Sequence, residues 1–147
     1  MREDGIIKIE VHVSGICIKR DPKAGHLVLL GKRSPNRKLY PGLWESGGGQ
    51  VYLGETFESA IKRQFKEEFG IEIEIRNIIG CYSIPLENGV IPGVVFYCQP
   101  SNGHLLHADE REFTEVKWVC IDDLAKINII PGTKLDILKA IKMVSNN

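Results

Sequence analysis

One short amphipathic segment, FESAIKRQFKEEF from Phe57 to Phe69, constrains this chain more than any other stretch. Thr56 before it is a good N-cap residue and Gly70 after it a good stop, so the segment is predicted to form one helix. At about 100° per residue, one face collects the apolar side chains Phe57, Ala60, Ile61, Phe65 and Phe69. The far, solvated face collects Ser59, Lys62, Arg63 and Lys66. The chain should therefore contain a helix that packs on one side.

The two acidic residues near the end of this helix do not join the solvated face. Glu67 and Glu68 fall with Gln64 along the edge of the apolar face, at spacings that bring side chains together. Carboxylates beside a core-facing stripe repel each other and lose solvation, at a cost on the order of several kcal/mol unless a cation or donors compensate. Mg²⁺ prefers oxygen ligands of this kind. A solvated glutamate pair near a helix end explains the pattern equally well, so the helix alone leaves both interpretations open.

The other patterns predict a mixed sheet and a second helix. Strand-like alternation of apolar residues occurs in five runs, at 6–18, 26–34, 71–84, 93–99 and 113–121. Turn residues at 21–25 and 87–89 indicate hairpins, and 133–144 is apolar at helical spacing. Residues 34–49 are rich in Pro, Gly, Asn and aromatics, which indicates a long shaped loop with at most short strands.

Length and charge narrow the class of protein. A chain of 147 residues is expected to form one domain over 1–147. Its 19 Lys and Arg equal its 19 Asp and Glu, so no basic excess favours a nucleic-acid partner. No run approaches the roughly 18 apolar residues of a membrane span, so a cytoplasmic protein without a membrane partner is expected. The sequence does not determine the oligomeric state, and a homodimer stays open.

The cysteines are scattered singly, at Cys17, Cys81, Cys98 and Cys120. There is no CxxC pair and no histidine at zinc-ligand spacing, so neither a disulfide framework nor a zinc site is predicted. Buried or neutral thiols are expected, with an unrecognised reactive cysteine as the alternative.

The segment around the helix, GGGQVYLGETFESAIKRQFKEEFGI, resembles the Nudix box, in which Gly, Glu, Arg and three further glutamates stand at fixed spacing. The matching residues are Gly49, Glu55, Arg63, Phe65, Glu67, Glu68, Gly70 and Ile71. Gln64 is the one departure, because the family has glutamate there. The segments HLVLLGKRS, PGLWESGGG and EFTEVKWVCIDDL also resemble the family, so the resemblance covers nearly the whole chain.

This resemblance implies an α+β fold, a Nudix-type α/β/α sandwich in which a mixed β-sheet lies between helices. It implies that a loop-helix-loop motif holds Mg²⁺ or Mn²⁺ against the diphosphate of its substrate. The expected partner is a small molecule, a nucleoside diphosphate linked to another group. The expected reaction is substitution by water at phosphorus, with a carboxylate taking the proton.

Roles carried over from the family fall on three sets of residues. The expected metal ligands are the Gly48 carbonyl, Gln64, Glu67, Glu68 and Glu112, of which the last four are also the expected catalytic groups. The expected structural residues of the motif are Gly49, Glu55, Arg63 and Gly70. Glu112 falls where many relatives place an additional acidic ligand or base, but an ordinary exposed glutamate in the acidic run 109–112 fits its sequence equally well.

Three residues before the box are candidates for substrate binding. Arg33 and Arg37 could bind phosphates, because the planar guanidinium suits them, although single exposed arginines are common. Trp44 could stack on a base, although aromatic residues in such a loop more often pack it down.

Gln64 leaves the catalytic interpretation open. An amide can coordinate a metal through oxygen, but it cannot accept a proton at neutral pH. The protein therefore uses another base, with Glu112 the first choice; or it is a binding module without hydrolysis; or the glutamine was introduced deliberately to trap substrate. Isomerase chemistry on an isoprenoid diphosphate is less favoured, because its cysteine and glutamate setting is not evident.

Overall fold

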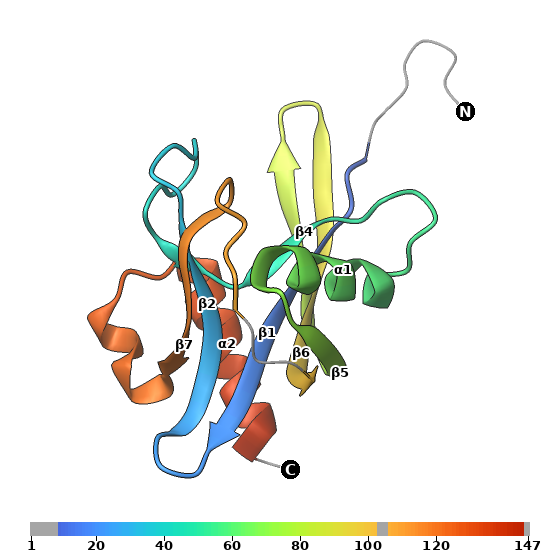
Figure 1. The fold of residues 1–147 in the computed structure, drawn as a ribbon. Helices are drawn as coiled ribbons and strands as arrows, with labels where there is room; N and C mark the ends of the chain where they lie inside the picture. The colour runs from blue at the N-terminus through green and yellow to red at the C-terminus, as the bar shows by residue number, and fades with distance from the viewer. Residues whose placement is uncertain (1–8, 103–105, 146–147) are drawn as a thin grey trace, which may run out of the picture.

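The computed structural model describes residues 9–102 and 106–145, which form strands and helices in the order drawn in Figure 1. The strands are β1 (His12–Asp21), β2 (Gly25–Arg33), β3 (Trp44–Glu45), β4 (Gly47–Gln50), β5 (Glu72–Leu86), β6 (Gly89–Asn102) and β7 (Phe113–Cys120). The helices are α1 (Phe57–Phe69), the 3₁₀ helix η1 (Ile121–Lys126) and α2 (Pro131–Ser145).

Strand β1 organises the sheet. Its first half pairs antiparallel with β4 on one side and parallel with β6 on the other. Its second half pairs antiparallel with β2, which also carries β3 and β7, while β6 carries β5. The mixed sheet predicted from the sequence is confirmed.

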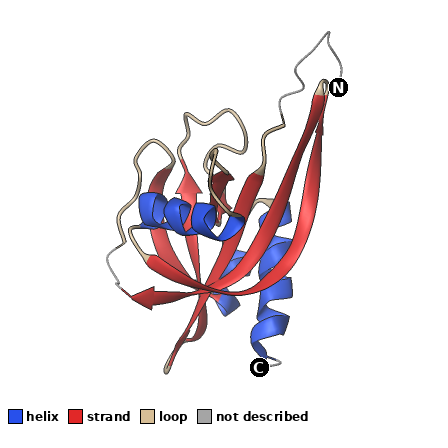
Figure 2. Ribbon diagram, turned by 90° about the vertical axis from the view of Figure 1, so that its right-hand side faces the viewer, coloured by secondary structure: helices blue, strands red, loops and turns tan. Residues whose placement is uncertain are grey.

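The two α-helices cover opposite faces of this sheet, as Figure 2 shows. On the α1 face the buried core includes Phe65, Phe69 and Val13, and on the α2 face it includes Ile16 and Ile137. Two glycines let α1 approach closely, because a Cβ on Gly47 would lie 2.8 Å from Phe69, and one on Gly15 would lie 2.9 Å from Phe65. The predicted α+β sandwich is therefore confirmed.

Helix α1 begins and ends as its sequence predicts. The Thr56 hydroxyl accepts from the Ser59 N–H at 3.0 Å, and the Ser59 hydroxyl accepts in return from the Thr56 N–H. Gly70 closes the helix in the left-handed conformation, with φ 70°. The prediction for Phe57 was wrong: the residue is 41% exposed, because it lies at the start of the helix beside the loop before α1.

The element boundaries differ from the predictions in three places. β1 begins at His12 instead of residue 6; residues 9–11 form no strand, and residues 6–8 lie outside the described part of the chain. The hairpin of β5 and β6 is longer than predicted, and Gly89 belongs to its second strand. Helix α2 begins at Pro131, whose ring suits the first turn of a helix. No helix within the described ranges is long and apolar enough to cross a membrane.

Candidate active site

Arg63 ties the loop before α1 to the helix. Its Nε and Nη2 donate to the two carboxylate oxygens of Glu55 at 2.7 and 3.0 Å, and its Nη2 also donates to the Gln50 carbonyl at 2.9 Å. The guanidinium lies 3.8 Å from the centre of the Tyr52 ring. The hydrogen bonds from Arg63, joined by one from the Tyr52 N–H, hold the pKa of Glu55 below its ordinary value. The loop therefore has little freedom next to the helix.

Glu68 is the most buried acidic group of the site, with 5% of its surface exposed. Its Oε1 accepts from the Gly48 N–H at 3.1 Å, which joins α1 to β4. Burial raises its pKa well above the usual range, and the nearby carboxylates of Glu45 and Glu112 raise it further. A buried carboxylate close to two others is a position where a bound cation would be strongly stabilised.

The other two side chains predicted at this edge differ in burial. Gln64 is 8% exposed, and its Nε2 donates a long hydrogen bond, 3.4 Å, to the Gln50 carbonyl. A Cβ on Gly49 would lie 2.5 Å from that amide nitrogen, so only glycine leaves room for it. The Glu67 side chain is 54% exposed and pairs with Arg63 at 3.3 Å, because open groove rather than sheet adjoins this side of α1.

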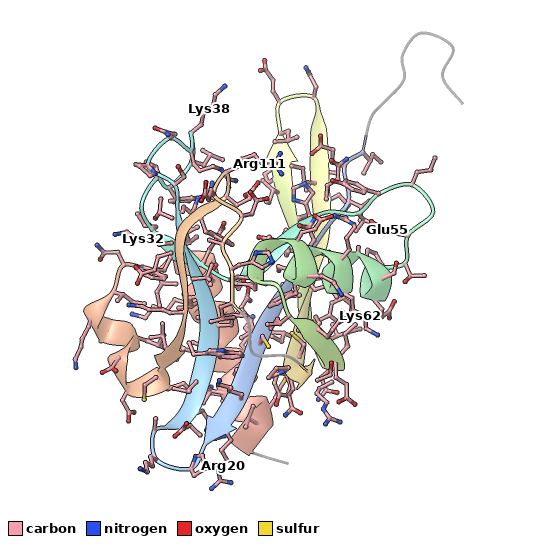
Figure 3. The ribbon with its side chains drawn as sticks, in the orientation of Figure 1. Arg20, Lys32, Lys38, Glu55, Lys62 and Arg111 are labelled. Atoms are coloured by element: carbon pink, nitrogen blue, oxygen red, sulfur yellow. The ribbon has the colours of Figure 1, made fainter. Side chains whose placement is uncertain are left out.

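Two loops form the opposite rim of the site. Glu112, just before β7, forms an ion pair with Arg37 of the loop between β2 and β3. The same loops are joined by the backbone, because the Ser34 N–H donates to the Glu112 carbonyl at 3.0 Å. Arg111 pairs with Asp109 on this rim. Figure 3 shows Arg111 at the same end of the molecule as Lys38, and Lys38 follows Arg37 in the loop between β2 and β3.

These residues enclose a hollow of about 400 Å³, here called the carboxylate groove. Its lining comes from β4, the loop after it, α1 and the two rim loops: Arg37, Gly48, Gly49, Gln50, Tyr52, Gln64, Glu67, Glu68, Asp109, Arg111 and Glu112. The sequence predicted most of these residues at the site, but not Gln50, Tyr52, Asp109 or Arg111. The acidic run 109–112 was the available signal for the last two.

The donor set suits a hard divalent cation, because the described residues of the groove offer carboxylate, amide and peptide oxygens and no thiol or imidazole. Within the described residues, no three acidic, histidine or cysteine side chains converge closely enough to hold a metal ion as they stand. Glu112 is paired with Arg37 and Glu67 with Arg63. Both glutamates would have to turn from these arginines to become ligands.

The structure does not bring two of the predicted substrate-binding residues into the groove. Arg33 is 7% exposed; it pairs with Glu45 at 2.7 Å and donates to the Leu39 carbonyl at 2.9 Å. Trp44 is buried in the core on the α2 side, where its backbone bonds to Asn128 and Ile130. The Arg33 side chain thus holds the loop between β2 and β3, and the Trp44 side chain packs in the core.

A second hollow of about 470 Å³, here called the helix-edge pocket, lies on the α2 side of the sheet. It is lined by β5, β6 and the first turns of α2, and its polar side chains include Ser14, Ser46, Tyr82 and Asp136. Ser14 pairs with Gly48 across β1 and β4, so one residue of this pocket lies beside one residue of the carboxylate groove, although the two hollows share no lining residue.

A family model, described as the NUDIX domain, matches residues 10–139 of the chain. A MutT-like protein of Streptomyces ambofaciens is 32% identical over 116 residues, which are 79% of this chain and 67% of the relative. An ADP-ribose pyrophosphatase of Methanocaldococcus jannaschii is 33% identical over 119 residues, 80% of this chain and 65% of the relative. The chain thus spans about two thirds of these relatives.

Two further comparisons cover more of both chains. A prenyl-diphosphate phosphatase of Methanosarcina mazei is 27% identical over 142 residues, 90% of this chain and 81% of the relative. The Nudix domain of NrtR from Shewanella oneidensis, solved with ADP-ribose, has a TM-score of 0.76 at 18% identity and covers 98% of this chain and 94% of that one. Because the family model spans most of the chain and the fold agrees, the chain belongs to the Nudix hydrolase family.

Proposed function

We propose that this protein hydrolyses the diphosphate bridge of a small nucleoside diphosphate derivative with the help of Mg²⁺ or Mn²⁺. The observation that carries the proposal is the carboxylate groove, where buried Glu68 faces a rim that contains both Glu112 and Arg37. Such a site combines oxygen ligands for a cation with a guanidinium for a phosphate and a second carboxylate for a proton.

Each residue has a distinct part in the proposed reaction. Glu67, Glu68 and the Gly48 carbonyl would hold the cation, which when bound neutralises the diphosphate and acidifies an attacking water. Arg37 would exchange its ion pair with Glu112 for one with the diphosphate. This exchange costs little Coulomb energy, because one anionic partner replaces another, and it frees the Glu112 carboxylate.

Glu112 is the proposed general base, because Gln64 cannot accept the proton at neutral pH. The water oxygen forms a bond to phosphorus, the bridging oxygen–phosphorus bond breaks, and the water proton passes to Glu112. The products are a nucleoside monophosphate and a phosphorylated remainder. The Gln64 amide would keep its hydrogen bond to the Gln50 carbonyl and so preserve the shape of the loop before α1.

The nucleoside is proposed to occupy the helix-edge pocket. Its volume lies in the usual range of small-ligand sites, and Ser14 in its lining pairs with Gly48 of the carboxylate groove. The archaeal ADP-ribose pyrophosphatase supports a nucleotide derivative as substrate. The prenyl-diphosphate phosphatase supports the alternative in which an apolar chain replaces the nucleoside, and a substrate panel separates the two.

The test is product analysis with Mg²⁺ over nucleoside triphosphates, ADP-ribose, nucleotide sugars, dinucleotides and a prenyl diphosphate. We expect turnover of a nucleotide, a fall in kcat of about 10²–10⁴ in Glu112→Gln, and little change in Gln64→Glu. Glu110→Gln is the matched control, because Glu110 is an exposed neighbour on the same loop. Full activity of Glu112→Gln would refute its role as base.

A second candidate is a binding module that does not hydrolyse its nucleotide, and Gln64 is the observation that favours it. It predicts that the unmodified chain binds nucleotide with Mg²⁺ but releases no product. Activity restored only by Gln64→Glu would mean that the glutamine alone disables an otherwise complete site.

A further inference from the structure

The aromatic ring of Tyr82 lines one side of the helix-edge pocket. It stands opposite Gly93 in the β5–β6 pair, and a Cβ on Gly93 would collide with the Tyr82 ring. The ring therefore lies flat across β6, where only glycine leaves room for it. Burial raises the pKa of the Tyr82 hydroxyl, and the nearby Ser14 side chain on β1 partly offsets this rise. A half-buried ring held in this way is a ready stacking surface.

Asp136 brings a negative charge to the same pocket. It lies on α2, half-buried, and is close enough to influence the Tyr82 hydroxyl. Its carboxylate makes no hydrogen bond or ion pair with any residue that the structure describes, although Lys139 lies near it. Partial burial raises the pKa of Asp136, so the folded protein leaves this carboxylate short of donors.

The remaining lining is mixed. Its larger apolar side chains are Ile84, Val95, Ile130 and Leu135, and its other polar side chains are Ser14, Ser46, Thr133 and Lys139. A ligand with a flat apolar face and N–H donors on one edge would match this combination. A nucleobase has this form, since its faces stack and its edge carries donors and acceptors.

We propose that the helix-edge pocket selects guanine, which stacks on Tyr82 while Asp136 accepts hydrogen bonds from its N1–H and its amino group. This inference rests on the proposed function, because it assumes that the substrate is a nucleotide whose diphosphate lies in the carboxylate groove. It assigns Asp136 as a residue that determines specificity, outside the motif of α1 and its loop.

Adenine is the base against which this selection is measured. Its corresponding edge offers one amino group beside an acceptor nitrogen, and that nitrogen would face a carboxylate oxygen. Guanine satisfies both oxygens, and a good bidentate pair is worth about five- to hundredfold in discrimination. Since one archaeal relative is named an ADP-ribose pyrophosphatase, adenine is also the natural competitor.

The test is calorimetric titration of the intact chain with the α,β-methylene analogues of GDP and ADP in the presence of Mg²⁺. We expect the GDP analogue to bind at least tenfold more tightly, and Asp136→Asn to abolish that preference. Asp122→Asn is the matched control, because Asp122 is an exposed aspartate on η1 and should leave both affinities unchanged. Gly93→Ala, which displaces the Tyr82 ring, should weaken both analogues and keep their ratio.

Two outcomes would overturn the inference. Equal affinity for the two analogues, or a preference for guanine that survives in Asp136→Asn, would refute the role of Asp136 and leave the proposed hydrolysis standing. Failure of both analogues to bind, together with turnover of a prenyl diphosphate, would refute the guanine site and the nucleotide substrate together. Melting temperatures of the variants confirm that each is folded at the temperature of titration.

Discussion

Gly31→Ala should destabilise the protein because of one aromatic ring. A Cβ on Gly31 would lie 2.6–2.7 Å from three atoms of the fully buried Phe113 ring, which itself stacks on Phe69 with centroids 5.3 Å apart. The ring would have to retreat by roughly 1 Å into a packed core, and overpacking of this kind costs about 1–3 kcal/mol. For a chain of this length the melting temperature should fall by roughly 3–10 °C.

The assay is thermal and urea unfolding of a double-mutant cycle. Gly80→Ala is the control, because Gly80 also lies in a strand but a Cβ there would meet nothing within 4 Å. Phe113→Leu removes the obstructing ring, so its cost and that of Gly31→Ala should not add. Additive costs, or a Gly31→Ala protein as stable as Gly80→Ala, would refute the reasoning.

Three further predictions concern charge and thiols. Glu55→Gln should destabilise the protein near neutral pH, and this loss of stability should vanish in acid. Arg63 lowers the pKa of Glu55 in the folded protein below the ordinary value of 4.5. The stability that Glu55 contributes is therefore present above pH 4.5 and is lost as the pH falls through the pKa of the folded protein. Gln64→Glu should lower the stability of the metal-free protein by roughly 1–3 kcal/mol in urea, because it buries a further carboxylate. Burial and a hydrogen bond with Cys98 raise the pKa of the Cys17 thiol. Ellman's reagent should therefore modify exposed Cys81 in the native protein and Cys17 only after unfolding.

Each of these predictions has a contradicting result. The acid profile of Glu55→Gln should be compared with that of Glu87→Gln, an exposed glutamate in the β5–β6 turn, and identical profiles would argue against the brace to Arg63. A Gln64→Glu protein as stable as the unmodified chain would mean that the groove tolerates one more charge without a cation. Rapid modification of Cys17 in the native protein would mean that the core opens locally.

Local signals made part of the structure predictable. A cap, a stop residue and an apolar period all lie within fifteen residues of one another around α1, so its limits were read directly from the sequence. The same is true of Arg63 and Glu55, whose spacing matched a known motif. The wheel placed Glu67 beside Glu68, but it could not tell which edge of the helix would be covered by the sheet and which by an open groove.

Contacts between distant segments were not predictable in this way. Arg33 was a candidate for binding phosphate until folding placed Glu45 and the Leu39 carbonyl around its guanidinium. Asp136 and Tyr82 are separated by more than fifty residues, and no pattern in either segment indicates that α2 closes over β5. The sequence predicted most of the groove that belongs to one helix and its loop, but not the pocket whose lining comes from β1, β5, β6 and α2.

The charge of the groove connects these observations. Glu68 is buried next to the carboxylates of Glu45 and Glu112, which is unfavourable without a cation. The ion pair between Arg37 and Glu112 offsets part of this negative charge. A glutamate at position 64 would add one more negative charge to this set, whereas the amide of Gln64 donates to a carbonyl. The glutamine thus lowers the electrostatic cost of the metal-free groove at the expense of one proton acceptor. If the protein hydrolyses its substrate, the proton acceptor has to be a residue of the two rim loops, and Glu112 is the proposed one. A diphosphate that binds Arg37 would release Glu112 from its ion pair, so substrate binding would itself free the general base.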